Sequence, residues 1–185
     1  MIISPLAVIL LVILAVVIVA FGSYIYFRER RTKLLRSQFG PEYTRTIKQT
    51  GNRSEAEERL REREKRVRRF NIRALSREDR TRFLTRWQKL QSDFVDDPDK
   101  AIQRADDLLG EVMETRGYPV SDFDQRSADL SVDHPHVVQN YRAAHQIALD
   151  HERGEAGTEE LRQAMIHYRA LFEELVTESE PAHAE

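Results

Sequence analysis

The hydrophobic and polar positions divide the chain into one uninterrupted apolar run and a series of helical patterns. Residues 6–27 read LAVILLVILAVVIVAFGSYIYF and contain no charged residue. At about 1.5 Å rise per residue, such a helix spans roughly 33 Å, and the hydrocarbon core of a bilayer is about 30 Å thick. A segment in lipid must be helical, because no water is present to pair with its backbone groups. The run predicts a transmembrane helix over 6–27, after a short N-terminal tail at 1–5.

Residues 28–50 are basic and continue the helical pattern. Gly40-Pro41 interrupts it, because proline removes a backbone donor and disfavours helix in the residue before it. Across this break an apolar side chain recurs every four residues, at Leu35, Phe39, Tyr43 and Ile47. A stripe this narrow fits either the lipid headgroups or a partner helix.

A third pattern follows the break at 50–53. Ser54 to Glu57 matches a capping box, which predicts that a helix begins there and runs to about Phe70. Nearly every residue of this helix is charged, and the apolar positions that align are only Ala56, Leu60 and Val67. We interpret residues 28–70 as a basic juxtamembrane helical arm whose last helix is a solvated, salt-bridged spacer.

Residues 71–177 show apolar side chains at helical spacing in four main stretches. Ser76 is predicted to cap the first stretch, and Asp97-Pro98 to begin the second. Ser121 is predicted to cap a short helix, Gly154 to end the third main one and Thr158 to cap the last. No window shows strand alternation. The predicted fold is all-α: an antiparallel bundle of about four main helices, with Trp87 in its core, followed by an acidic flexible tail at 178–185.

Charge is distributed unevenly along the chain. Residues 28–89 hold 21 Lys/Arg and 9 Asp/Glu, for a charge of +12, whereas residues 90–185 carry −14. The chain has no cysteine, which excludes disulfides, thiolate metal sites and cysteine nucleophiles. A basic membrane-proximal half beside an acidic distal half produces a strong field.

The flanks of the apolar run predict its orientation. No Lys or Arg precedes it, and a cationic cluster follows it at Arg28, Arg30, Arg31, Lys33 and Arg36. The positive-inside rule places this cluster in the cytoplasm, and Tyr24 and Tyr26 fit the aromatic belt beside it. These seven residues are the predicted membrane-interface site. Ala20-Phe21-Gly22 leaves a cleaved signal peptide as an alternative, but the run continues past it, which favours a retained single-pass anchor.

Three segments carry a resemblance to a known family. They are FGPEY at 39–43, RGYPVSDFDQRSADLSVDHPHVVQNYRAAH at 116–145, and the closing LRQAMIHYRALFEELV at 161–176. Together they resemble an uncharacterised family of bacterial single-pass membrane proteins. The resemblance implies a bacterial origin and, together with the predicted span, a location in the bacterial inner membrane. It implies no site residues, since that family has no assigned activity.

Residues that could bind a metal or catalyse a reaction are concentrated between Tyr118 and His145. This region holds several potential metal ligands: Asp122, Asp124, Asp129, Asp133, His134, His136 and His145. Helical metal sites usually place ligands as H-E-x-x-H or E-x-x-H, and neither motif is present. We expect His145 to be a hydrogen-bonded core histidine. We expect buried ion pairs from Arg126, Arg142 and Arg169 to Asp129 or Asp133, and we predict no catalytic residue, metal or cofactor.

Three functions are compatible with these features. The favoured one is a membrane-anchored cytoplasmic interaction or scaffold module that binds another protein or a second copy of itself. The alternative is binding of anionic lipid or nucleic acid through the basic arm. Nucleic acid is disfavoured because Glu62 and Glu64 interrupt the cations of 61–69 and no aromatic residues alternate with them. A metal-dependent enzyme is the third hypothesis.

Overall fold

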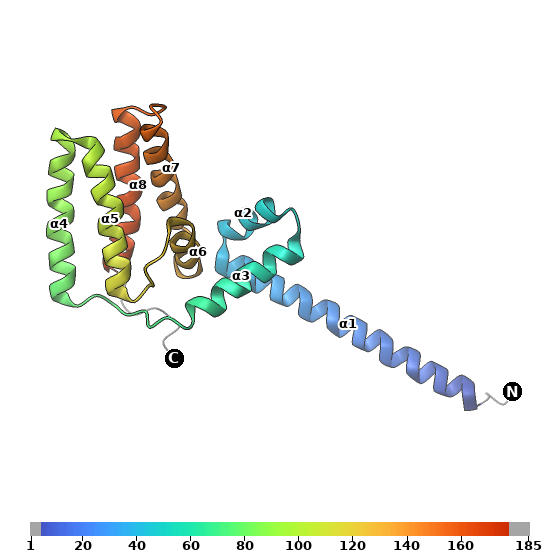
Figure 1. Cartoon of the computed structure of the whole chain (residues 1–185). Coiled ribbons are helices and arrows are strands. Elements are labelled where there is room, and N and C mark those ends of the chain that lie inside the picture. The colour runs from blue at the N-terminus through green and yellow to red at the C-terminus, as the bar shows by residue number, and fades with distance from the viewer. Residues whose placement is uncertain (1–4, 178–185) are drawn as a thin grey trace.

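In this computed structural model the backbone is described for residues 5–177 and the side chains for residues 14–177. The described part is all-helical, as predicted, and contains no strand (Figure 1). Its helices are α1 (Pro5–Phe39), α2 (Pro41–Thr50), α3 (Arg53–Val67), α4 (Arg77–Asp96), α5 (Pro98–Arg116), α6 (Phe123–Asp133), α7 (Val138–Glu152) and α8 (Thr158–Thr177). Residues 1–4 of the N-terminal tail predicted at 1–5, and the tail predicted at 178–185, lie outside the described residues, and Pro5 is the first residue of α1.

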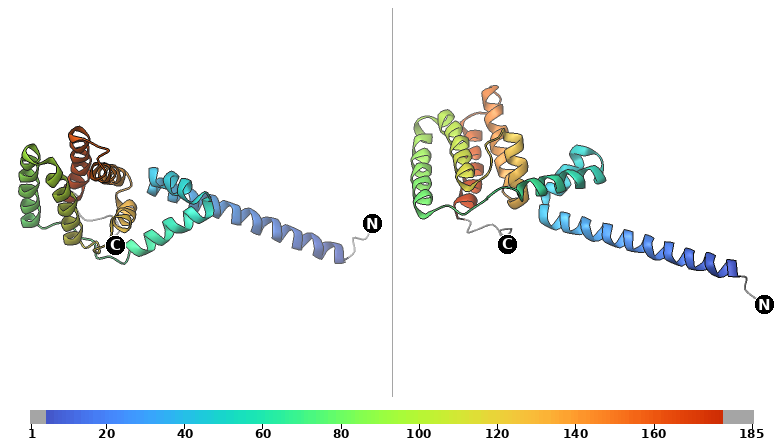
Figure 2. Two further views of the ribbon diagram at one scale, coloured as in Figure 1. Left: turned by 45° about the horizontal axis from the view of Figure 1, so that its top comes forward. Right: turned by 60° about the horizontal axis from the view of Figure 1, so that its bottom comes forward.

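Helix α1 projects away from the rest of the molecule as a single long rod (Figures 1 and 2). Every side chain from residue 14 to residue 31 is exposed. Within the described part of the chain, no helix combines the length and apolar character needed to cross a membrane. The predicted span begins at residue 6, so its side chains at 6–13 lie outside the described part.

Helices α4, α5, α8 and α7 pack side by side in that order and form a helical bundle (Figure 1). Its core is apolar, and Trp87 is 4% exposed there, with its ring stacked on Phe172 at a centroid distance of 4.5 Å. Ser76 and Asp97 cap α4 and α5 as predicted: each side chain accepts a hydrogen bond from a backbone N–H three residues later. The core position predicted for Trp87 is confirmed.

The arm is not a solvated spacer. The end of α1 packs with α2 and α3, and α3 lies against α6. These elements bury a second apolar cluster formed by Leu35, Phe39, Tyr43, Leu60, Val67 and Val132. Of the two surfaces predicted to cover the stripe, lipid headgroups or a partner helix, the structure shows a helix, and that helix is α3 of the same chain. The aligned apolar positions of α3 are sparse, but they are matched by this stripe, and that pairing makes the packing possible.

Local sequence signals misplaced three helix starts. Asn52, not Ser54, caps α3, because its side-chain oxygen accepts hydrogen bonds from the backbone N–H groups of residues 54 and 55. Asp122, one residue after Ser121, caps α6. Thr158 is the first residue of α8 rather than its cap. In two of the three cases neighbouring residues are both good N-cap types, so residue type alone does not select between them.

The connection between arm and bundle is packed rather than free. The backbone N–H of Arg73 donates to the carbonyl oxygen of Arg116 at 2.8 Å. Gly117, which ends α5, has a φ of 100° and would place an added Cβ 2.2 Å from the carbonyl oxygen of Asn71. Phe70 and Ile72 contact both apolar clusters. The arm is therefore attached to the bundle along the chain as well as through α3 and α6.

Candidate functional site: the charge network between arm and bundle

The seven predicted membrane-interface residues lie on α1, and all of them are exposed. Tyr24 and Tyr26 are 61% and 63% exposed. No ion pair joins any of the five cations, Arg28, Arg30, Arg31, Lys33 and Arg36, to another described residue. These five cations lie on the part of α1 that follows directly on the apolar stretch of the same helix.

The histidines of the region 118–145 do not converge. His134 is buried, with its Nδ1 atom 3.5 Å from Oε1 of Glu174. His136 is exposed and lies beside Gly40. His145 is half-buried and stacks on the ring of Phe123 with centroids 3.6 Å apart, and burial lowers its pKa below the usual range. The expected hydrogen-bonded core histidine is instead a ring-stacked one.

The arginines pair with partners other than those expected. Arg126 pairs with Asp106 on α5 at 3.1 Å, and Arg169 pairs with Glu173 on its own helix at 2.7 Å. Neither contacts Asp129 or Asp133. Asp133 accepts a hydrogen bond from the hydroxyl of Tyr118 at 3.0 Å. The expected pairing within the region is therefore wrong: Arg126 pairs with a residue of another helix, and Arg169 pairs with the residue four positions later on its own helix.

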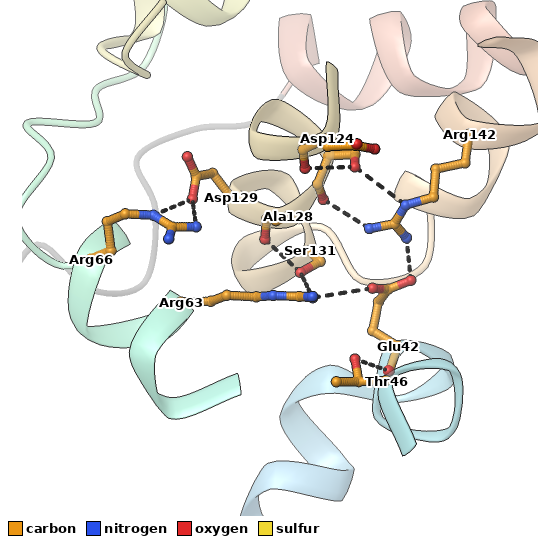
Figure 3. A network of polar contacts seen from close by, with 10 residues as sticks. Glu42, Thr46, Arg63, Arg66, Asp124, Ala128, Asp129, Ser131 and Arg142 are labelled. Carbon is orange, nitrogen blue, oxygen red and sulfur yellow. Dashed lines mark hydrogen bonds and ion pairs between the residues drawn. The ribbon is translucent and has the colours of Figure 1, made fainter. Parts of the chain in front are cut away.

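Glu42 of α2 is the centre of a buried charge network (Figure 3). Its side chain is 1% exposed and accepts a close hydrogen bond from Nη1 of Arg142 on α7. Arg63 of α3 approaches the other carboxylate oxygen at 3.6 Å. One carboxylate therefore joins three helices, two from the arm and one from the bundle.

The guanidinium groups around Glu42 are held by α6 as well. Arg142 donates through Nη2 to the carbonyl oxygen of Ser127 at 3.2 Å, and Arg63 donates to the hydroxyl of Ser131 at 3.4 Å (Figure 3). Burial lowers the pKa of both Arg63 and Arg142, and the nearby Arg45 lowers it further, while the Glu42 carboxylate opposes the shift. A buried carboxylate between these cations compensates for part of their desolvation.

A second buried ion pair, between Arg66 and Asp129, lies beside this network. Asp129 of α6 is 3% exposed and accepts two hydrogen bonds from Arg66 of α3, at 2.8 and 2.5 Å (Figure 3). Gln125, one turn earlier on α6, donates to both carboxylate oxygens. Arg63 and Arg66 are three residues apart on α3, so both project from one face towards α6. This face fixes the position of α3 against the bundle.

Glu57 organises the interior of the arm. Its carboxylate accepts hydrogen bonds from Thr32 of α1 at 2.8 Å, from the Tyr43 hydroxyl of α2 at 2.9 Å, and from Arg53 at 3.0 Å. Burial raises the pKa of Glu57, but the hydrogen bonds from these three donors outweigh it, and the pKa is lowered overall. The sequence assigned Glu57 to a capping box, whereas in the structure it holds three helices together.

The ion pairs of this arrangement hold the helices of the arm against those of the bundle. In the described residues, no group of three or more His, Asp or Glu side chains is placed to hold a metal ion. The carboxylates of Glu42 and Asp129 are occupied by guanidinium donors. Sequence reasoning missed Glu42, and its only local signal is an acidic residue beside the apolar positions Phe39 and Tyr43. Its partner Arg142 lies 100 residues away in the chain.

Comparisons with known proteins leave the family open. No protein-family model matches this chain, and neither a curated protein nor a solved structure matches it significantly.

Proposed function

We propose that this protein is a membrane-anchored helical interaction module. The N-terminal part of α1 is a single-pass anchor, with its short N-terminus outside. The arm and bundle lie on the cytoplasmic side and bind another protein or a second copy of this chain. The resemblance in three sequence segments supports placing it in a bacterial inner membrane.

The observation that carries this proposal is the apolar surface of α1. Ten large hydrophobic side chains between residues 14 and 27 are at least 41% exposed: Leu14, Val16, Val17, Ile18, Val19, Phe21, Tyr24, Ile25, Tyr26 and Phe27. Contiguous apolar surface of this kind marks a site of contact with membrane or protein. It surrounds the helix rather than forming one stripe, and a helix that is hydrophobic all round needs apolar surroundings on every side.

The cations at the end of the apolar stretch support the orientation. Arg28, Arg30, Arg31, Lys33 and Arg36 are exposed and follow the last apolar residue of the stretch directly. Positive charge of this kind is retained on the cytoplasmic side.

The fixed attachment of arm to bundle supports an interaction role. Because Glu42 and Asp129 bind arginines across the arm–bundle contact, α1 and the bundle keep one relative orientation. A fixed connection of this kind suits a scaffold, because one face of the bundle is then held at a set height above the bilayer.

The anchor is tested by extraction of membranes with alkaline carbonate. The full chain should remain in the membrane pellet and be released only by detergent. A variant carrying Val16→Asp, Val19→Asp and Ile25→Asp serves as the control and should be recovered in the supernatant. Release of the unaltered chain by carbonate alone would contradict the anchor.

Orientation is tested with single cysteines, which the cysteine-free chain permits. Gln163→Cys on the exposed surface of α8 should react with a membrane-impermeant maleimide only after cells are permeabilised. Labelling in intact cells would place the bundle outside.

The interaction role is tested by crosslinking in cells, followed by purification in detergent. The full chain should yield one consistent partner or a homo-oligomer, and a chain ending at residue 40 should not. Recovery of an uncrosslinked monomer from the full chain would remove the proposed role.

A further inference from the structure

A groove between α1 and α3 lies beside the predicted end of the span. Arg31, Leu34 and Leu35 line it from α1, Arg61 and Glu64 line it from α3, and Arg68 lines it from the residue that follows α3. The residues on each helix follow i, i+3 or i+4, i+7 spacing, so each set forms one row along its helix. The groove is therefore bordered by two rows of side chains that contain three guanidinium groups and one carboxylate.

The charges in the groove are only partly compensated. Arg61 donates to Glu58 at 2.8 Å and to Glu57 at 3.4 Å, and Arg68 pairs with Glu64 at 2.5 Å. Arg31 makes no ion pair with a described residue. Arg31 therefore has no counter-charge in the described part of the chain. An anion between Arg31 and Arg61 would stabilise both guanidinium groups.

The groove lies at the level of the lipid headgroups when the predicted span lies in the hydrocarbon core. Arg31 comes four residues after Phe27, which corresponds to about 6 Å along the helix. The headgroup layer adds about 5–8 Å on each side of the hydrocarbon core. Arg31 thus lies at the level of the lipid phosphates when Phe27 lies at the edge of the hydrocarbon.

The groove also offers apolar surface. Leu34 is 60% exposed at its rim, and Leu35, which is 6% exposed, forms its floor. A phospholipid has a phosphate and adjoining carbon atoms, and this combination matches arginines placed beside leucine. A nucleic acid would need aromatic side chains for base stacking, and the lining residues of this groove include none.

We propose that the α1–α3 groove binds the phosphate of an anionic phospholipid, with Arg31 and Arg61 as its principal donors. Arg68 lines the same groove as a pair with Glu64, and Leu34 contacts the carbon atoms of the lipid. The proposal rests on the membrane anchor proposed above, and it adds a specific lipid class to that function.

The test uses the full chain in mild detergent with equimolar phosphatidylglycerol and phosphatidylcholine, and native mass spectrometry to count bound lipids. The unaltered chain should retain phosphatidylglycerol preferentially. Arg31→Gln should lower this preference about fivefold, the effect of losing one cation near an acidic surface. The triple variant Arg31→Gln, Arg61→Gln, Arg68→Gln should abolish it. Arg31→Gln alone keeps the test informative if the triple variant does not fold.

A matched triple variant separates a built site from general surface charge. The variant Arg28→Gln, Lys33→Gln, Arg36→Gln removes three positive charges, as the groove variant does. All three lie on α1, and none of these residues lines the groove. This variant should lower the preference less than the groove variant does. An equal loss in both variants, or no preference in the unaltered chain, would overturn the proposal.

Two competitors identify the ligand. Inorganic phosphate or a DNA oligonucleotide should leave the bound phosphatidylglycerol in place. Displacement by phosphate would make the groove a free-phosphate site, and displacement by the oligonucleotide would make it a nucleic-acid site. Either result would overturn the lipid proposal. Failure of the anchor is separate: a chain that resists carbonate extraction but retains no phosphatidylglycerol loses only the groove proposal.

Discussion

The bundle and the arm are stabilised in different ways. The bundle buries a large apolar cluster centred on Trp87, Tyr141 and Phe172. The arm buries only Leu35, Phe39, Tyr43, Leu60 and Val67 of its own, together with Val132 of α6. It adds buried carboxylates, with Glu42 1% and Glu57 6% exposed, whereas in the bundle the guanidinium of Arg116 is buried and donates to the carbonyl oxygen of Leu175.

This difference has physical consequences. Apolar burial is nondirectional and depends little on pH or salt, so the bundle should tolerate changes in both. A buried carboxylate is favourable only while its donors are present, and removal of one partner leaves a desolvated charge. The arm should therefore respond sharply to single changes of charge that leave the bundle intact.

The largest effect is expected from Trp87→Ala. Loss of a stacked, 4% exposed indole should destabilise the bundle by about 3–5 kcal/mol. Thermal unfolding of the full chain in detergent, followed by circular dichroism, measures it, with Trp87→Phe as the control that keeps an aromatic ring. An unchanged melting temperature would show that the bundle core is not organised around this residue.

Glu42→Gln should destabilise the arm and its contact with the bundle. Arg63 and Arg142 are 18% and 12% exposed as side chains, so they lose a counter-charge in surroundings that are only partly solvated. We expect about 3 kcal/mol, at the lower end of the cost of breaking a buried pair. Hydrogen exchange should increase in α2 and α3.

The bundle provides the internal control for that experiment. Trp87 is the only tryptophan of the chain, so its fluorescence reports the bundle alone. Its emission should be unchanged by Glu42→Gln. A simultaneous loss of bundle structure would contradict the division into two differently stabilised parts.

Sequence patterns predicted the bundle better than the arm, for a physical reason. The helices around 76–116 have apolar positions at helical spacing and unambiguous caps at Ser76 and Asp97. In the arm the stripe from Leu35 to Tyr43 was detected, but its partner was not. A stripe shows that a surface will be buried, and says nothing about which other surface covers it.

The ion pairs between arm and bundle were even harder to predict from the sequence than the apolar contacts of the arm. Glu42 and Arg142 are separated by 100 residues, and Arg66 and Asp129 by 63. Ion pairs have no periodicity, so no pattern along the chain connects the two members. The Asp and His residues of 118–145 had suggested a local cluster, whereas Asp129 pairs with α3. Their partners depend on how the arm folds back.

Gly117→Ala should have a smaller effect at the junction of arm and bundle. Its φ of 100° lies in the left-handed region, and the added Cβ would meet the carbonyl oxygen of Asn71. We expect about 2 kcal/mol from the left-handed conformation and the close contact together, and less from a variant that meets only the conformational cost. Gly154→Ala, which has a φ of 75° but no atom within 4 Å of the added Cβ, is the matched control. A greater loss for Gly154→Ala, by thermal unfolding, would contradict the packed junction.

The smallest effect concerns pH. The folded state lowers the pKa of Glu57, so its contribution to stability is complete above the unfolded value and is lost as pH falls through the folded value. Above pH 5, Glu57→Gln should destabilise the arm by about 1 kcal/mol. As pH falls through the lowered pKa of Glu57, this difference should shrink because the carboxylate becomes protonated. Hydrogen exchange of α2 measures it, and a difference that grows in acid would reverse the assigned direction.

The central claim is that arm and bundle form one body, and a distance measurement tests it most directly. Gln49→Cys on α2 and Gln163→Cys on α8 are exposed positions in a chain without other cysteines, so both can carry spin labels. Pulsed electron paramagnetic resonance on the full chain should give one narrow distance distribution, which Glu42→Gln broadens. A broad distribution that Glu42→Gln leaves unchanged would show that the arm is a free tether and would contradict this account.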